Sequence, residues 1–473
     1  MSEWRDRSPG EERVVEGPPE DRSPRGWSLA ARALLERVSR HRGWRGSELL
    51  LVSSERLSLE LDVRSGSFVS SRGQGLSASA RVWTEQGVGG ASAPVATVAD
   101  LERLLGAAAD LVSSRAPAAL PAPCVGGQAP SAEWRSEVSL ARAKTRAERV
   151  AREAVPPGVL VQALVVTQRS AGALLVRSDG SESFWRDDGA DTFLRCETSR
   201  GALVDAVAAP LALEAGQEDL GPLRARQEAA VGALEREDLG PLRARLEDAV
   251  GALEGPLARA DLSLPLVLRP SVAAPLVAGL AWLLRGDVAG ATPALVRAVG
   301  RKLFPSLLTV VDDPLDVRGT RRRGVDDEGR PARVLRLVDE GRLMGFLHSE
   351  ETAARLGVEP TGRGFREGVS SASPMPLNLC VLPREDALPA DYTELVARVE
   401  TFTTMATPGT VSLIAGGWEV RGGRRVRRVT PLELDLPVLE TFRGLRGVGA
   451  DLTFFPSAEG CGTPTLVLPP PRG

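Results

Sequence analysis

The spacing of hydrophobic and polar positions changes several times along the chain, and each change predicts a different kind of element. Apolar residues recur at helical spacing over 27–40 and again over 98–113, so both segments are expected to be helices. Between them, residues 47–93 form short alternating segments broken by Ser and Gly, a pattern typical of an antiparallel meander. Residues 158–185 predict two more strands, joined by a turn at Asp179–Gly180.

One segment is apolar on every side. Residues 269–287, RPSVAAPLVAGLAWLLRGD, have a helix start at Pro270 and Ser271, a long apolar run and a polar end. The run Val272–Leu284 is shorter than the ~20 residues that a membrane span requires. We therefore expect a helix here that contains no polar side chain able to perform chemistry.

The order of the predicted elements divides the chain into four parts. Residues 1–26 are charged and rich in Pro and Gly, and are expected to form a disordered tail. An N-terminal domain of helices and antiparallel strands is expected over 27–210, with a Pro/Gly linker at 115–130. A duplicated helical insertion occupies 214–258, and a strand-rich, barrel-like C-terminal domain occupies 262–473. Because helices and strands are segregated, the predicted fold class is α+β.

The insertion contains two nearly identical copies of a 19-residue segment, EDLGPLRARQEAAVGALER (218–236) and EDLGPLRARLEDAVGALEG (237–255). Two copies are too few for a solenoid, which needs three or more units. A lengthened surface helix or a helical hairpin broken at the Gly–Pro steps is the favoured interpretation. A coiled-coil surface for a partner protein is the alternative.

Composition narrows the function classes. The 59 basic and 62 acidic residues give a formal charge of −3, which offers no reason to expect a polyanionic partner. Four scattered cysteines without a CxxC pair predict neither a disulfide framework nor a zinc knuckle. Since the first residues also lack the apolar core of a signal peptide, we expect a cytoplasmic protein bound to neither nucleic acid nor membrane. Five arginines within 421–428 are interpreted as the solvated face of a hairpin that turns at Gly422–Gly423.

The densest set of motifs lies in residues 309–381. Asp312, Asp313 and Pro314 predict one turn, and Asp327, Glu328 and Gly329 predict another. The segment RVLRLVDEGRLMGFL predicts a hairpin that turns at 339–341. None of these turns by itself indicates chemistry.

The order of these motifs nevertheless resembles the TldD/PmbA family of bacterial peptidases. The matching features are DD before an extended loop, a DEG turn, a hairpin leading to Leu, TAARLG, PTG followed by Arg, Pro–x–Asn before a strand, and a closing GxPTL-like strand. In this chain the motif positions of unassigned role are Asp312, Asp313, Glu328, Gly329, Thr361, Gly362, Arg366 and Asn378.

The resemblance implies a two-domain metallopeptidase fold. Catalytic members carry HExxxH on a helix ahead of the DD segment, with a cysteine near the C-terminus as a further zinc ligand. Two imidazoles and a thiolate leave one zinc position open for the water that the glutamate deprotonates. The apolar segment 269–287 occupies the place of that helix, and the HExxxH window falls near Ala278, Gly279 and Leu283.

That window reads AGLAWL and contains neither histidine nor glutamate. The two histidines of the chain lie elsewhere: His41 is interpreted as a solvated cap and His348 as an exposed loop residue. Cys461 lies near the terminal cysteine of the family, but the segment between it and PTL is shorter, so a small buried residue is the favoured interpretation. We expect no catalytic residue, no cofactor and no metal in this chain.

The resemblance thus implies a TldE/PmbA-type, non-catalytic subunit. Its expected partner is a TldD-type, HExxxH-bearing subunit that holds zinc, and its expected substrates are extended peptides, including precursors of peptide natural products. Two alternatives stay open. One is a divergent peptidase with unconventional ligands among Asp312, Asp313, His348 and Cys461. The other is a stand-alone, homodimeric peptide-binding protein.

Overall fold

The structure is a computed structural model of the 473-residue chain. It describes residues 19, 21–39, 44–63, 65–112, 120–131, 133–134, 136, 138–208, 238–316, 318–321, 323–366, 371–404, 409–456 and 460–471. Residues 1–18, His41 and the first copy of the duplicated segment therefore lie outside the described residues, as do the expectations made for them.

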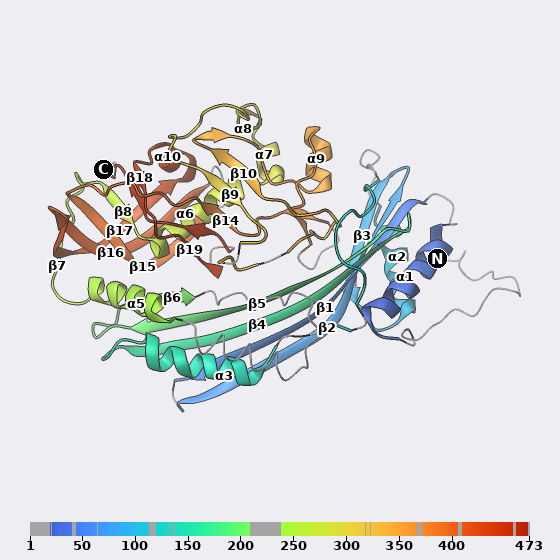
Figure 1. Cartoon of the computed structure of the whole chain (residues 1–473), viewed down its shortest axis with the longest axis horizontal. Coiled ribbons are helices and arrows are strands. Elements are labelled where there is room, and N and C mark those ends of the chain that lie inside the picture. The colour runs from blue at the N-terminus through green and yellow to red at the C-terminus, as the bar shows by residue number, and fades with distance from the viewer. Residues whose placement is uncertain are drawn as a thin grey trace, which may run out of the picture.

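The N-terminal part contains one long, curved antiparallel sheet that runs beneath the C-terminal part (Figure 1). Its strand order is β3-β2-β1-β4-β5-β6. The strands are β1 (Trp44–Asp62), β2 (Ser67–Thr84), β3 (Gly87–Pro94), β4 (Leu160–Arg177), β5 (Glu182–Glu197) and β6 (Leu203–Ala208).

Alternate residues of β1 point to opposite faces of the sheet. Helices cover the face that carries the leucines at odd-numbered positions. Leu49 and Leu51 pack under α1 (Pro24–Ser39) and α2 (Val98–Asp110), and Leu57 packs under α3 (Leu140–Arg149). The last turn of α3 widens into a π turn at Val150–Ala154. The opposite face, which carries Glu48 and Leu50, is turned toward the C-terminal part.

The C-terminal part contains two larger mixed sheets and one short hairpin. The seven-stranded sheet has the order β18 (Gly447–Val448), β21 (Leu466–Leu468), β8 (Leu266–Leu268), β15 (Tyr392–Thr404), β16 (Thr410–Arg421), β17 (Arg424–Pro437), β7 (Leu257–Ala258). The six-stranded sheet has the order β11 (Arg342–Leu343), β10 (Leu335–Asp339), β9 (Val310–Asp312), β14 (Leu379–Val381), β20 (Gly462–Thr463), β19 (Thr453–Phe454). The hairpin pairs β12 (Gly364–Phe365) with β13 (Ser373–Pro374).

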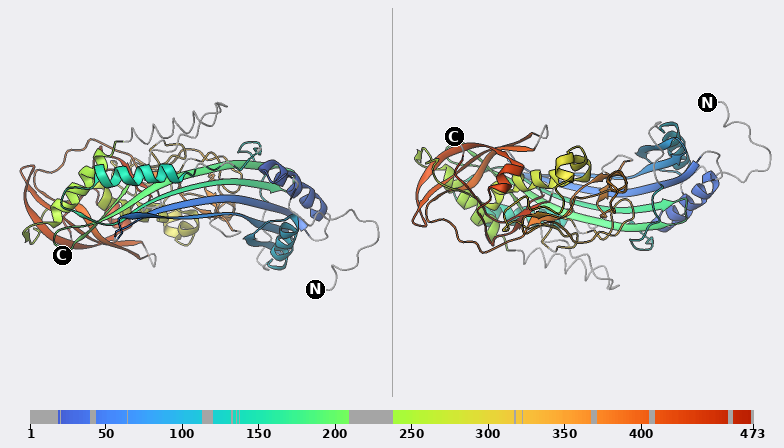
Figure 2. Two further views of the ribbon diagram at one scale, coloured as in Figure 1. Left: turned by 90° about the horizontal axis from the view of Figure 1, so that it is seen from below. Right: turned by 90° about the horizontal axis from the view of Figure 1, so that it is seen from above.

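The apolar helix predicted from the sequence is α6 (Pro270–Leu283), and it forms the centre of this part. It contacts β8, β15 and β16 of the larger sheet and β14 and β20 of the other. The remaining helices lie around the sheets (Figure 2). They are α5 (Gly240–Leu253), α7 (Gly286–Gly290), α8 (Pro293–Val296), α9 (Glu350–Leu356) and α10 (Val438–Arg443).

The predicted α+β class is confirmed, but the segment 47–93 differs from its prediction in strand length. Instead of short segments, it forms β1 of 19 residues and β2 of 18 residues, followed by the shorter β3. Ser53, Ser54, Gly73 and Gly75 lie inside these strands rather than between them. β1 has an antiparallel partner on each side from Glu48 to Glu60, which satisfies its backbone, so Ser53 and Ser54 are tolerated inside the strand. Gly73 and Gly75 of β2 pair with Arg56 and Ser54 of β1.

Candidate functional site

Helix α6 has no room for the residues of a metal site. Gly279 faces the core, where an added Cβ would lie 2.9 Å from Cγ2 of Val438 and 3.2 Å from Cγ2 of Val411. Leu283 is also buried in the core cluster around this helix. A glutamate at 279 or a histidine at 283 would therefore displace core side chains, and the residues present do not fit a zinc ion.

An aromatic ring covers the remaining part of the HExxxH window. Ala278 is half-buried and packs, with Ala274, against Phe455, whose side chain is buried. The backbone N–H of Phe455 donates to the carbonyl oxygen of Cys461 at 2.9 Å, so this ring is held by the segment that contains the C-terminal cysteine. Cys461 itself is fully buried in the core cluster.

The two aspartates of the DD motif have different roles. Asp312 is fully buried and accepts a 2.5 Å hydrogen bond from Nε of Arg363, itself fully buried. The same carboxylate accepts the backbone N–H groups of Leu377 and Asn378. Asp313 instead caps a turn, since its Oδ1 accepts the N–H of Leu315 at 2.9 Å.

Asn378 and the PTG segment (360–362) connect the loops that surround Asp312 and His348. Nδ2 of Asn378 donates to the carbonyl oxygens of Asp313 and Arg321 at 2.9 and 2.6 Å. Thr361 accepts the backbone N–H of His348 at 2.7 Å through its hydroxyl oxygen. Gly362 adopts φ +68°, and an added Cβ would lie 2.3 Å from the carbonyl oxygen of Pro331. These motif residues therefore fix loops against one another.

The DEG turn and Arg366 join the two halves of the molecule. Glu48 on β1 pairs with Nε of Arg81 at 2.6 Å, with Nε of Arg177 at 2.9 Å, and with Arg366. Glu328 lies 3.5 Å from Arg81, and its carbonyl oxygen accepts Nη2 of Arg177 at 2.9 Å. We call these five residues the domain joint. Its charges come from three strands of the N-terminal sheet and two loops of the C-terminal part.

The turn itself is set by a buried aspartate and a glycine. Asp326 accepts the N–H groups of Glu328, Arg330 and Gly364 at 2.9–3.0 Å. Burial, followed by repulsion from Glu328, raises the pKa of Asp326 to about 7. Gly329 adopts φ +70°, and an added Cβ would lie 2.7 Å from Sγ of Cys124.

Burial alone would raise the pKa of Glu48, but Arg366, and then Arg81 and Arg177, lower it below its ordinary range. Glu48 is thus ionised in the folded protein at neutral pH. A carboxylate with no access to water is stable here only because three guanidinium groups surround it.

His348 was expected on an exposed loop, and that expectation is wrong. Its side chain is 5% exposed. Nδ1 lies 3.3 Å from Oγ1 of Thr352, and the ring meets Phe346 edge-on. Gly286 of α7 packs so closely that an added Cβ would lie 2.3 Å from Nδ1. Burial lowers the pKa of His348.

The lowered pKa of His348 makes its contribution to stability depend on pH. Because the unfolded chain binds a proton at His348 more readily than the folded chain, this contribution to the free energy of unfolding should fall as pH drops below about 6.5, by at most about 1.4 kcal/mol per pH unit. Asp326, with its raised pKa, acts in the opposite direction over the same range, so the His348 contribution is measured as the difference between wild type and His348→Asn in denaturant titrations between pH 8 and 5. An unchanged slope in that variant would contradict the assignment.

The alternative ligand set does not assemble. Asp312 is engaged by Arg363 and His348 by Thr352, while Cys461 lies in the apolar core. Within the described part of the chain, no three His, Cys, Asp or Glu side chains come close enough together to hold a metal ion.

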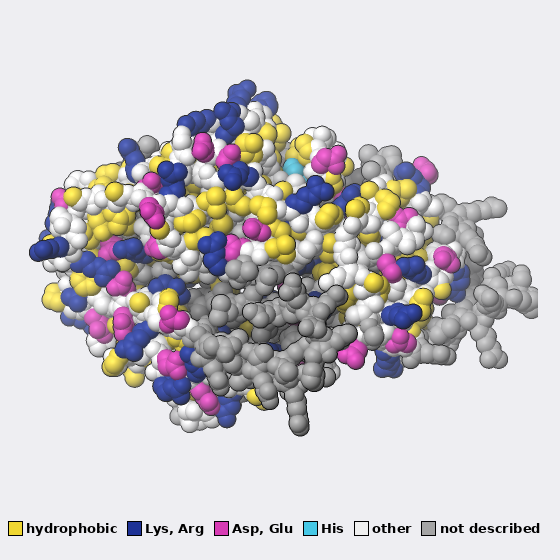
Figure 3. Space-filling view, viewed as in Figure 1, with side chains coloured by type: hydrophobic (Ala, Val, Ile, Leu, Met, Phe, Trp, Pro, Cys, Tyr) yellow, Lys and Arg dark blue, Asp and Glu magenta, His cyan; other side chains and the backbone are white. Residues whose placement is uncertain are grey.

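The basic stretch 421–428 forms the predicted hairpin, with its turn at Gly422–Gly423, and three of its five arginines, Arg421, Arg425 and Arg427, are in ion pairs. Arg421 contacts Glu419 and Asp261, and Arg425 contacts Glu394 and Asp248. In the face shown in Figure 3, side chains of both signs are interspersed over the larger sheet. The arginines of this hairpin therefore lie among acidic partners.

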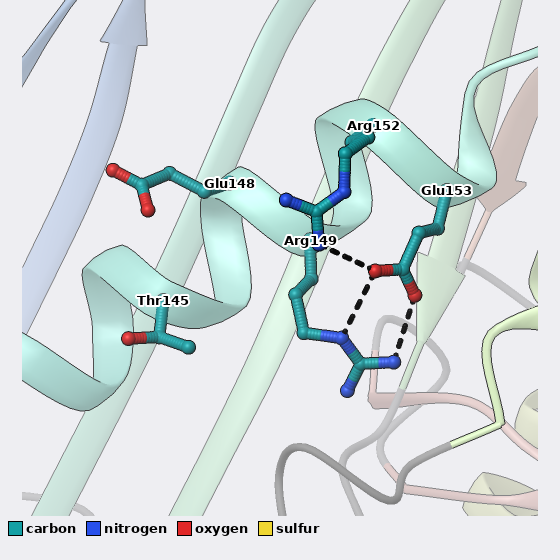
Figure 4. A pocket seen from close by; sticks show the side chains of 5 residues that line it. All are labelled: Thr145, Glu148, Arg149, Arg152 and Glu153. Atoms are coloured by element: carbon teal, nitrogen blue, oxygen red, sulfur yellow. Dashed lines mark hydrogen bonds and ion pairs between the residues drawn. The ribbon is translucent and has the colours of Figure 1, made fainter.

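A hollow of about 410 Å³ lies on α3, and it is lined by Thr145, Glu148, Arg149, Arg152 and Glu153 (Figure 4). Arg149 and Arg152 both pair with Glu153, at 2.8 and 2.7 Å. The hollow is on the sheet face opposite the domain joint, and its charges are satisfied locally. Among the helices of the described residues, none is both long and apolar enough to cross a membrane.

Several structural residues were missed by sequence reasoning. Glu48, Arg81 and Arg177 form part of the domain joint, and Arg363 pairs with Asp312. The first three belong to no local motif, and Arg363, which directly follows PTG, was not singled out. A signal did exist: Glu48, Arg81 and Arg177 each adjoin an apolar strand segment on the same face of the sheet. Charged residues in such positions are rarely buried unless they are paired.

Comparison with known proteins agrees with this architecture. Residues 262–469 match the model of the PmbA/TldA metallopeptidase C-terminal domain. A metalloprotease of Synechocystis sp. is 26% identical over 172 residues, which is 35% of this chain and 37% of that protein. A metalloprotease TldD homolog of Buchnera aphidicola is 32% identical over 18% of this chain and 17% of its own length. The chain thus spans well under half the length of these relatives.

Solved structures cover far more of the chain. TldE from Thermococcus kodakarensis superposes with a TM-score of 0.74 and 18% identity over 93% of this chain and 99% of that one. A proposed modulator of a DNA gyrase from Thermotoga maritima superposes with a TM-score of 0.70 and 17% identity, over 94% and 99% of the two chains. The predicted family resemblance is confirmed by the match to residues 262–469, and the fold is shared along nearly the whole chain.

Proposed function

We propose, from the premise that residues 262–469 are a PmbA/TldD-family metallopeptidase domain, that this chain is a non-catalytic, TldE-like subunit of a zinc protease. Its partner would be a TldD-type subunit that carries HExxxH and holds the zinc. The pair would act on unfolded peptides or precursors of peptide natural products. This chain would contribute part of the substrate channel.

The observation that carries the proposal is the packing of α6. In chain order α6 follows β8 and precedes β9, which is where the metal helix of a catalytic member is expected. All its side chains except that of Ser271 are apolar. Gly279 and Leu283 face the core, and Phe455 covers Ala278. The fold shared with a protein named TldE is consistent with this role.

An open strand edge supports a contribution to substrate binding. β2 pairs with β3 only from Ser77 to Thr84, so Ser67–Leu76 has a strand partner on one side only among the described residues. An extended peptide can pair with such an edge through its main chain, which requires little side-chain specificity.

The test is reconstitution with a TldD-type protein from the same organism. We expect the tagged chain to co-purify with that protein and the pair to cleave a flexible peptide, while this chain alone does not. Replacing the partner's HExxxH glutamate with glutamine should abolish cleavage.

Two outcomes would contradict the proposal. Chelator-sensitive cleavage by this chain alone would favour a divergent peptidase. A stable homodimer that binds peptides and does not bind the TldD-type protein would favour a stand-alone binding protein.

A further inference from the structure

Helix α5 occupies a defined position between the two halves of the molecule. It packs against β6, the π turn, β15 and β16, and we call this surface the α5 slot. Leu242, Leu246, Val250 and Leu253 of α5 are buried in it. Figures 1 and 2 show the helix at the end of the long sheet, beside the C-terminal sheet.

The sequence of α5 is the second copy of the duplicated segment. Copy one (218–236) and copy two (237–255) differ at only three of 19 positions. Copy two has Leu246, Asp248 and Gly255, and copy one has Gln227, Ala229 and Arg236 in their places.

Each of the three residues specific to copy two lies in surroundings that its counterpart in copy one would fit less well. Leu246 is fully buried. Asp248 accepts both Nη1 and Nη2 of Arg425, at 2.8 and 3.1 Å. Gly255 adopts φ +92°, with an added Cβ position 3.0 Å from Nη1 of Arg428. A buried glutamine amide, a lost ion pair and a strained arginine would each weaken docking of copy one.

The rest of the docking face is common to both copies. Leu239 at the N-cap of α5 and Leu242, Val250 and Leu253 within the helix are all buried. Copy one has the same residues at the matching positions 220, 223, 231 and 234. The main-chain contact is also common, because Arg428 donates to the carbonyl oxygen of Gly251 at 2.6 Å and needs no particular side chain there.

We propose that the α5 slot accepts either copy, and that copy one is a weaker competitor for it within the same chain. The three differing residues set the preference for copy two. If copy one docked in place of copy two, the segment that links β6 to the docked helix would become 19 residues shorter, and the segment that links the docked helix to β7 would become 19 residues longer. The link from β6 would then shorten to residues 209–219, which can still reach roughly 36 Å when extended. This inference does not rest on the proposed subunit role.

Two deletion variants of equal length test whether the α5 slot accepts either copy. Removing 218–236 leaves copy two, and removing 237–255 leaves copy one, so the two variants have equal length and differ only at the three positions. We expect both to fold, with β15 protected from hydrogen exchange near Val396 and Ala397, and the copy-one variant to melt several degrees lower. Loss of that protection in the copy-one variant, or equal melting temperatures, would overturn the proposal.

Replacement of copy two by copy one in the full chain is tested by Gln227→Leu, with Glu228→Gln as the control. We expect Gln227→Leu to raise hydrogen-exchange protection in peptides of copy one and to lower it in peptides of copy two, while the control changes neither. An unchanged pattern of hydrogen-exchange protection in Gln227→Leu would contradict competition between the two copies. A gain that depends on protein concentration would also contradict it, because the docking would then occur between chains.

Discussion

Replacing Glu48 with glutamine should destabilise the protein by about 3–5 kcal/mol, because it leaves the buried guanidinium groups of Arg81, Arg177 and Arg366 without their shared carboxylate. The effect should appear in denaturant unfolding of the full chain at neutral pH. Since the Glu48–Arg366 pair connects β1 to the C-terminal part, we expect the junction between the halves to lose protection first.

The control lies on the same strand. Glu60 is exposed and also belongs to β1, so Glu60→Gln should change the free energy of unfolding by less than about 0.5 kcal/mol. Equal effects of the two substitutions would show that the joint does not hold the two halves together.

Grafting a metal motif onto α6 should fail for steric reasons. The combination Ala278→His, Gly279→Glu and Leu283→His forces a carboxylate into the space beside Val438 and removes a core leucine. We expect a loss of at least about 4 kcal/mol and no peptidase activity from this chain alone.

Single glycine substitutions separate packing from helix propensity. Gly279→Ala should destabilise, because its Cβ would lie 2.9 Å from Val438. Gly106→Ala in α2 has open space around the new Cβ and should stabilise the protein by roughly 0.5–1 kcal/mol.

For the triple graft on α6, robust peptidase activity would contradict the expectation, because it would mean that the rest of a catalytic site had survived.

The sequence predicted elements whose signals are local. The α6 helix, the hairpin at Gly422–Gly423 and the turn at Gly329 follow from apolar runs and from glycines that adopt positive φ. The order of the DD, DEG and PTG motifs also identified the family resemblance, although it did not reveal what these residues do.

Contacts between distant residues could not be predicted in this way. Glu48 and Arg366 are 318 positions apart, and Asp312 and Arg363 are 51 apart, so no spacing rule connects them. The burial of His348 similarly depends on α7 packing against its ring, which no feature of the MGFLH segment indicates. The motif residues thus gained structural roles only when their partners were known.

Helix α6 packs as a core helix and not as a metal helix. The most direct test is the metal content of the purified chain, expressed alone and measured by elemental mass spectrometry. We expect less than about a tenth of an equivalent of zinc or any other transition metal, because α6 supplies no ligand. Close to one equivalent of tightly bound zinc would contradict the claim, and His348 and Cys461 would then be the first residues to substitute.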